Sequence, residues 1–141
     1  MTIETKQSID QLMGRFDGKK SWEERYSEIV KMGRELPAMA DSDKTENNRI
    51  KGCLSQVWLT AKLDDGKVYF SADSDALIVK GIIALLVNAL SGMTPQEIVQ
   101  TDFGFLDQIG LRQHLSMNRS NGLTSMLKQL KLYGLAFSTQ V

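Results

Sequence analysis

The chain is poor in the residues that build disulfides and metal sites, with one cysteine, one histidine and two prolines among 141 residues. One cysteine cannot form an internal disulfide, and the simplest setting for such a chain is a reducing, cytoplasmic one. One cysteine and one histidine cannot complete the usual four-ligand zinc site, and an iron–sulfur cluster would lack its thiolates within the chain. We therefore expect no metal site here.

The chain also lacks a surplus of charge and a long hydrophobic run. Lys+Arg and Asp+Glu number 17 each, which argues against binding nucleic acid through a broad basic surface. The longest apolar stretch, Ala76–Leu90, is interrupted by Lys80 and Asn88 and falls short of the roughly 20 residues of a membrane span. The first ten residues contain no hydrophobic core of a secretory signal, so we expect neither membrane insertion nor export.

Several helices are expected from apolar spacing and capping residues. Ser21 with Glu24, and Thr94 with Glu97, form capping boxes in which hydroxyl and carboxylate satisfy free backbone amides. Ala76–Leu90 is apolar nearly all round, which predicts the central buried helix. The short oxygen-bearing side chains of Asp73-Ser74-Asp75 are expected to cap that helix, and Ser120 or Asn121 to cap the last one.

A β-hairpin is predicted between the polar loop that follows Asp41 and the buried helix. Residues 57–63 and 68–72 alternate between apolar and polar, and Asp64-Asp65-Gly66-Lys67 supplies the turn. A two-stranded hairpin alone is marginal in water, so a third strand is expected at Glu46–Lys51. The sequence thus predicts a single α+β domain over residues 1–141, with helices around an antiparallel sheet of about three strands.

Cys53 is the first candidate for chemistry and would lie in the tight link between two of these strands. The thiolate is the nucleophilic form of cysteine, and nearby positive charge lowers the thiol pKa. Arg49 and Lys51 lie close in sequence, and Gly52 allows the backbone to turn tightly beside the sulfur. A buried structural cysteine is the alternative that these residues leave open, because free cysteine is among the most buried residue types.

Two further residues could assist the thiol. His114 is the sole histidine, so a Cys–His thiol enzyme would have to use Cys53 with His114. Arg119 precedes the expected start of the last helix, where its charge opposes the helix dipole. Such local conflicts are more common at functional sites, although a solvated arginine is the simpler interpretation.

Several separated segments, in order, resemble the SufE family of sulfur-acceptor proteins, which includes CsdE. The similarity extends over roughly Ile9 to Leu130 and is carried by Asn48-Arg49-Ile50-Lys51-Gly52-Cys53-Leu54-Ser55-Gln56-Val57-Trp58, by Asp73-Ser74-Asp75-Ala76-Leu77-Ile78-Val79-Lys80-Gly81, by Gly110-Leu111-Arg112 with Leu115-Ser116, and by Asn118-Arg119-Ser120-Asn121-Gly122-Leu123. The family's Gly-Cys-Gln-Ser-Gln reads Gly52-Cys53-Leu54-Ser55-Gln56 here, so Leu54 stands where the family has a polar residue.

The resemblance implies a sulfur carrier rather than an enzyme. Cys53 would accept persulfide sulfur from a pyridoxal-phosphate cysteine desulfurase, stimulate that partner and pass sulfur to an iron–sulfur assembly scaffold. Arg119 would support Cys53, while Arg49, Lys51 and Gly52 are candidates for docking the partner. The chain itself would need no cofactor, and a homodimer is left open. The alternative is a scaffold or interaction module in which the cysteine is incidental.

Overall fold

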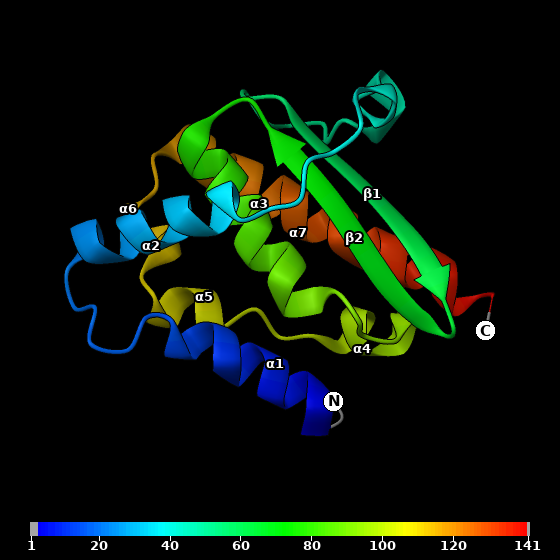
Figure 1. Ribbon diagram of the computed structural model, residues 1–141, viewed down its shortest axis with the longest axis horizontal. Coiled ribbons are helices and arrows are strands. Elements are labelled where there is room, and N and C mark those ends of the chain that lie inside the picture. Colours follow the sequence, from blue (N-terminus) through cyan, green and yellow to red (C-terminus); the bar gives the residue numbers. More distant parts are fainter. Residues whose placement is uncertain (1–2, 141) are drawn as a thin grey trace.

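The computed structural model describes residues 3–140, so Met1, Thr2 and Val141 of the expected single domain lie outside the described residues. Figure 1 shows the arrangement of the elements. In chain order they are α1 (Ile3–Gly14), α2 (Trp22–Arg34), the short 3-10 turns η1 (Asp41–Asp43) and η2 (Glu46–Asn48), β1 (Val57–Asp64), β2 (Lys67–Ser74), α3 (Leu77–Leu90), α4 (Pro95–Gln100), α5 (Phe105–Gln108), α6 (Leu111–His114) and α7 (Met117–Ser138).

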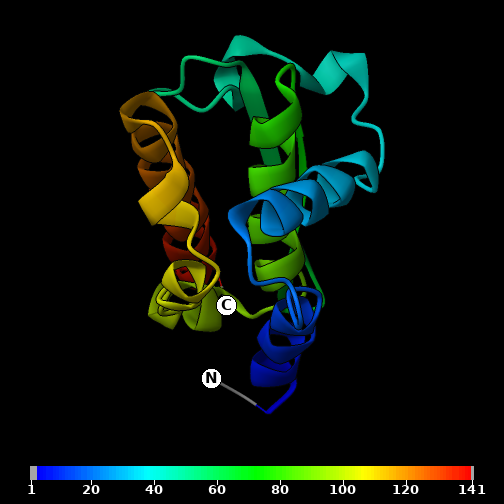
Figure 2. The same ribbon diagram turned by 90° about the vertical axis from the view of Figure 1, so that its left-hand side faces the viewer.

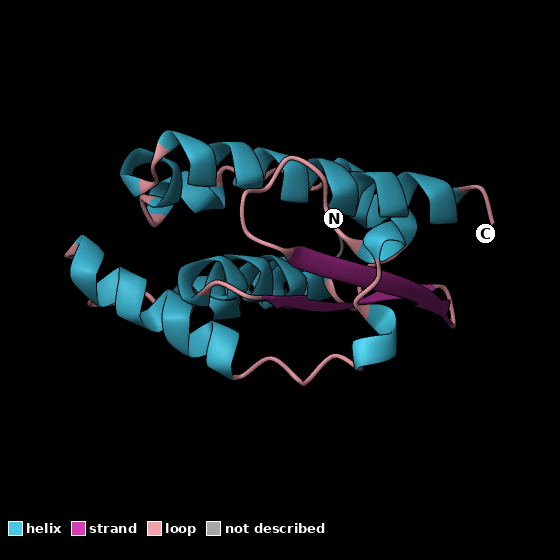
Figure 3. Cartoon of the chain, turned by 90° about the horizontal axis from the view of Figure 1, so that it is seen from above, coloured by secondary structure: helices cyan, strands magenta, loops and turns pink. Residues whose placement is uncertain are grey.

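The elements stack in three layers, with α3 and the hairpin in the middle. Figures 2 and 3 show α2 on one side of this layer and the long α7 on the other. The apolar side chains of α3 are almost all buried, and Ile83, Leu85 and Leu86 are fully so. The prediction of a central buried helix is therefore confirmed. None of the described helices combines the length and the apolar character needed to cross a bilayer.

Two glycines allow α2 and α3 to cross closely. A Cβ at Gly81 would collide with the main-chain carbonyl of Ile29, and a Cβ at Gly33 would lie 2.8 Å from the amide nitrogen of Gly81. Backbones approach this closely only where side chains are absent on both sides of the contact. The crossing packs α2 against α3, and Ile29 and Met32 are fully buried.

The sheet has two strands, and the expected third strand does not form. β1 and β2 pair antiparallel from Val57 with Ser74 to Asp64 with Lys67, as predicted. Residues 46–48 instead form η2, and an isolated bridge pairs Arg49 with Trp58.

The hairpin is stabilised by helices rather than by a third strand. Its core residues pack on α3, and from α7 the Tyr133 hydroxyl donates to the Leu59 carbonyl at 3.3 Å. The Tyr133 ring also meets Phe70 edge-on, with ring centroids 6.2 Å apart. This burial supplies what a two-stranded hairpin lacks when it stands alone.

Both predicted capping boxes form, whereas the caps predicted for α3 and for α7 do not. Ser21 and Thr94 accept from the backbone amides three residues on, and Glu24 and Glu97 reach back to the cap amides. By contrast, β2 continues to Ser74, and Ala76 stands at the N-cap of α3 without a side-chain hydrogen bond.

The last helix begins earlier than predicted. Ser116 is its N-cap and accepts from the backbone amide of Arg119, so residues 117–121 are already helical. Ser116, like Ser120 and Asn121, carries a side-chain oxygen that can cap a helix. Its hydroxyl accepts from the free backbone amide three residues further on. Arg119 therefore lies in the first turn of α7 rather than before the helix.

Candidate functional site

The loop that carries Cys53 is held firmly at its two ends. The amide of Ile50 donates to the carbonyl of Val57 at 2.8 Å, and the amide of Gln56 donates to Oδ1 of Asp75 at 3.0 Å. Between these anchors, residues 51–55 belong to no helix or strand. The cysteine therefore lies midway along a short segment whose ends are fixed to the hairpin.

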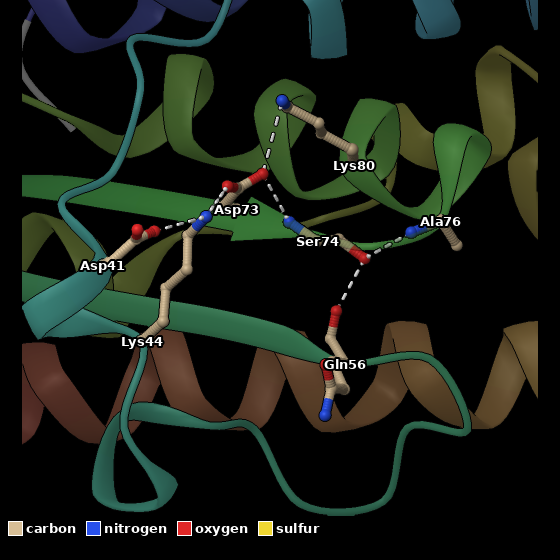
Figure 4. A network of polar contacts seen from close by, with 7 residues as sticks. All are labelled: Asp41, Lys44, Gln56, Asp73, Ser74, Ala76 and Lys80. Carbon is tan, nitrogen blue, oxygen red and sulfur yellow. Dashed lines mark hydrogen bonds and ion pairs between the residues drawn. The ribbon is translucent and has the colours of Figure 1, made fainter.

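A polar network reinforces the second anchor (Figure 4). The Ser74 hydroxyl donates to the Gln56 carbonyl at 2.7 Å, and Oγ accepts from the amide of Ala76. The neighbouring Asp73 carboxylate accepts from Lys44 at 2.9 Å and from Lys80 at 3.3 Å. The network joins the end of the cysteine loop to β2, to the start of α3 and to the polar segment around η1.

Two glycines bring the cysteine loop against α7, and Figure 2 shows the loop reaching towards that helix. Gly52 has a φ of +91°, and a Cβ there would collide with the Ser125 hydroxyl. The Cys53 thiol is half-buried and donates to the main-chain carbonyl of Gly122 at 3.6 Å. A Cβ at Gly122 would lie 3.4 Å from the sulfur, so a glycine inside the helix leaves room for it.

Cys53 opens into a cavity of about 470 Å³ between the loop, α3 and the first turns of α7. Val79 and Ile82 from α3 and Met126 from α7 supply apolar wall, and Arg119 supplies a cation. The structure thus brings Cys53 and Arg119 to one cavity from distant parts of the chain. The full lining is Cys53, Leu54, Ser55, Val79, Ile82, Ser116, Asn118, Arg119, Gly122 and Met126.

The charges beside Cys53 do not activate it in the way that the sequence suggests. Burial raises the pKa of the Cys53 thiol above its ordinary value, and the opposing effect of Arg49 is smaller. Lys51 instead binds the carboxylate and the carbonyl of Glu46. Arg49 thus acts in the expected direction, but desolvation disfavours the thiolate more strongly, so the thiol pKa is raised overall.

Two large apolar side chains beside the site are open to solvent. Leu54 is 81% exposed and Met117 is 80% exposed, one directly after the cysteine and the other at the first position of α7. The residue that departs from the family pattern therefore points its side chain outward. Leu54 also lines the rim of the Cys53 cavity, so it changes the exposed surface around the opening to the sulfur.

His114 belongs to a different part of the molecule. Its ring stacks on Trp22 with centroids 4.6 Å apart, and Nδ1 donates to the carbonyl of Gly110 at 2.8 Å. It is not among the residues that line the Cys53 cavity. The structure therefore does not form the Cys53–His114 pair that a thiol enzyme of this chain would need.

Two residues of the site were missed as individual candidates. Gly122 could have been found because a glycine inside a helix is unfavourable and often marks close approach. Glu46 could have been found from its spacing three residues before Arg49, which favours pairing. In the part of the chain that the structure describes, no group of three or more metal-binding side chains comes together.

Comparison with known proteins agrees with the fold. A solution structure of a hypothetical protein from Thermus thermophilus superposes with a TM-score of 0.73 and covers 96% of both chains. At 22% sequence identity, this similarity concerns the fold.

Sequence comparison identifies the family. An uncharacterized SufE-like protein from Synechocystis is 37% identical over 92% of this chain and 82% of its own length. Another from Rhizobium meliloti is 38% identical over 88% of this chain and 92% of its own length. Residues 10–133 match the family model described as "SufE: Fe-S metabolism associated domain". The chain therefore belongs to the SufE family.

Proposed function

We propose that this protein is a sulfur acceptor that takes persulfide sulfur from a cysteine desulfurase onto Cys53, stimulates that desulfurase and passes the sulfur to iron–sulfur cluster assembly. Membership of a family associated with Fe–S metabolism supports the pathway. The observation that carries the proposal is the position of the single thiol at a cavity shared with Arg119, on a short loop between two anchored ends.

The transfer needs no cofactor on this chain. The Cys53 thiolate attacks the outer sulfur of the donor's persulfide, and the sulfur–sulfur bond of the donor breaks, as in thiol–disulfide exchange. The donor sulfur leaves with the electron pair and takes up a proton, equivalent to the one that Cys53 loses. Cys53 then carries the persulfide, and no net oxidation occurs.

The resting thiol is not ready for this attack. It is half-buried, it donates to the Gly122 carbonyl, and its pKa is raised. Acceptance therefore requires residues 51–55 to move so that the sulfur leaves α7 and meets the donor. The thiol would then become reactive only when the donor binds. Loops on rigid scaffolds commonly move on binding in this way.

The surface around the loop offers contacts of two kinds for the donor. Arg49 and Lys51 provide positive charge next to the turn at Gly52, and Leu54 and Met117 provide exposed apolar side chains. Large apolar side chains tend to anchor protein interfaces, while charges guide the encounter. We propose that the donor binds over this face.

Intact mass measurement tests the proposal directly. The protein is incubated with a cysteine desulfurase and free cysteine, and we expect it to gain the mass of one sulfur atom. Cys53→Ala should gain none, because the chain has no other cysteine. The absence of any gain in the wild-type protein would favour the scaffold alternative, and an equal gain in Cys53→Ala would exclude Cys53 as the acceptor.

A further inference from the structure

We propose that Glu46 is a positioning residue that holds Arg49 and Lys51 in a salt-bridge cluster and thereby keeps the Cys53 thiol unreactive in the resting protein. The proposal rests on the proposed function only in treating Cys53 as the reacting group. It assigns a role to a residue that does not line the sulfur cavity. Its effect would add to that of burial, which is the larger cause of the raised thiol pKa.

The geometry of the cluster carries the argument. Nε and Nη2 of Arg49 donate to the two carboxylate oxygens of Glu46 at 3.0 and 2.8 Å, a bidentate pairing. Lys51 donates to one of the same oxygens and, at 3.2 Å, to the main-chain carbonyl of Glu46. One carboxylate thus engages both cations of the cysteine loop, and bidentate pairs fix orientation as well as distance.

The carboxylate keeps its charge at every pH at which the thiol titrates. Hydrogen bonds from Arg49 and Lys51 lower the pKa of Glu46 to about 2. Its negative charge would therefore cancel part of the positive potential that Arg49 creates at the sulfur. With Glu46 uncharged, the same cluster would carry two positive charges instead of a net charge of one.

The remaining charged neighbour of the sulfur comes from α7. Arg119 is the charged residue that α7 contributes to the cavity lining, while α3 contributes Val79 and Ile82, which are apolar. Asp75 is bound to the amide of Gln56 at the end of the loop. Arg49 is the cation that lowers the thiol pKa in the resting structure, so changes at Glu46 should act mainly through Arg49.

A thiol held in this way has an advantage between transfers. Oxidation and alkylation follow the thiolate fraction and exposure, so a protonated and half-buried sulfur is protected. A donor with its own carboxylates could replace Glu46 as the partner of Arg49 and Lys51. Both cations would then stay near the loop while the thiol becomes exposed. The salt-bridge cluster would then protect the Cys53 thiol in the free protein and release it when the donor binds.

The test measures alkylation of Cys53 in the isolated protein from pH 6 to pH 10, without a desulfurase. Glu46→Gln should shift the pH profile to lower pH and raise the rate with neutral iodoacetamide at pH 7 about two- to fivefold. The rate with anionic iodoacetate should rise more than that with iodoacetamide, because the local potential becomes more positive. Arg49→Gln should shift the profile the opposite way.

Matched variants separate charge from exposure. Asp65→Asn removes the same charge at the far end of the hairpin and should leave both rates unchanged, and Glu46→Asp should stay close to wild type. The double variant Glu46→Gln/Arg49→Gln should return towards wild type. An unchanged pH profile in Glu46→Gln would overturn the proposal, as would an equal acceleration with both reagents, which indicates exposure of the thiol. Neither result depends on whether Cys53 accepts sulfur from a desulfurase.

Discussion

At the scale of single residues, the site places one half-buried thiol, whose pKa is raised, at the same cavity as one exposed cation. Cys53 is held by the Gly122 carbonyl, and Arg119 lines the same cavity from the first turn of α7. The guanidinium makes no ion pair with any described residue, so its charge is available to an anion that enters the cavity. A persulfide is such an anion.

We expect Arg119→Ala to slow sulfur gain by Cys53 while leaving the fold intact. The lost charge acts on a partly solvated anion, so the effect should be about two- to fivefold in rate, the size of an exposed ion pair. The measurement is the time course of intact mass with a desulfurase and cysteine. It should be compared with the pH profile of thiol alkylation in the same variant.

Arg112→Ala is the matched control for this change. Arg112 is exposed on α6 and does not line the cavity, so its removal alters net charge alone. Sulfur gain should then proceed at the wild-type rate. If Arg119→Ala matched Arg112→Ala in both sulfur gain and alkylation, the supporting role of Arg119 would be refuted.

At the scale of elements, the crossing of α2 and α3 depends on the absence of two side chains. Gly33 and Gly81 face one another, and the carbonyl of Ile29 occupies the place that a Cβ at Gly81 would take. The crossing matters for the site because α3 provides Val79 and Ile82 to the cavity. A shift of α3 would therefore change the wall of the cavity into which the Cys53 sulfur opens.

We expect Gly81→Ala to lower the free energy of unfolding by about 2 to 3 kcal/mol, because the added methyl group must displace main-chain atoms. Urea denaturation at pH 7 measures the change. Gly14→Ala is the matched control, since a Cβ there meets only the Asp17 carboxylate at 3.9 Å. That variant should be neutral or slightly stabilised, and equal losses in both would show that close packing is not the cause.

Much of the element pattern could be predicted from local sequence. The hairpin, the buried helix and both capping boxes depend on spacing within a few residues, which the sequence displays directly. The third strand could not be rejected in this way, because the hairpin is buried by packing on α3 and by Tyr133 of α7, which only the folded chain shows. Ser116 and Ser120 are both acceptable cap residues by type, so the sequence alone does not distinguish them.

Cys53 and Arg119 could be named as candidates from the sequence, whereas the electrostatics around the thiol could not be predicted. Cys53 and Arg119 are marked by the family motifs, and the cavity brings them together. The raised pKa of Cys53 could not be predicted, because it arises from burial of the sulfur, and that burial exists only in the folded chain. Adjacent charges in a sequence do not reveal which partners they take in space.

At the scale of the whole molecule, the Asp73 network links elements that are separate in sequence. Burial opposes ionisation of Asp73, but hydrogen bonds from Lys44, the Ser74 amide and Lys80 outweigh it and lower the pKa of Asp73. A carboxyl whose pKa is lowered by folding stabilises the protein above its unfolded pKa of about 4. This contribution disappears as the pH falls through the folded pKa.

We expect Asp73→Asn to lower the free energy of unfolding by about 1 kcal/mol at pH 7 and by progressively less below about pH 4. Urea denaturation at pH 7, 5, 4 and 3 measures the difference between variant and wild type. Asp64→Asn, at an exposed position near the hairpin turn, should show little difference at any pH. A difference for Asp73→Asn that stays constant from pH 7 to pH 3 would exclude the ion pairs as its source.

The two anchors of the cysteine loop also limit how far the sulfur can travel. Cys53 lies three residues from Ile50 and three from Gln56, and an extended chain spans about 3.3 to 3.6 Å per residue. While both anchors hold, the Cα of Cys53 therefore stays within about 10 to 11 Å of each of them. A donor must accordingly bring its sulfur within that radius, plus one side-chain length. Under the proposed function, the depth of the donor's active site would thus become a criterion for which desulfurases could use this protein as an acceptor.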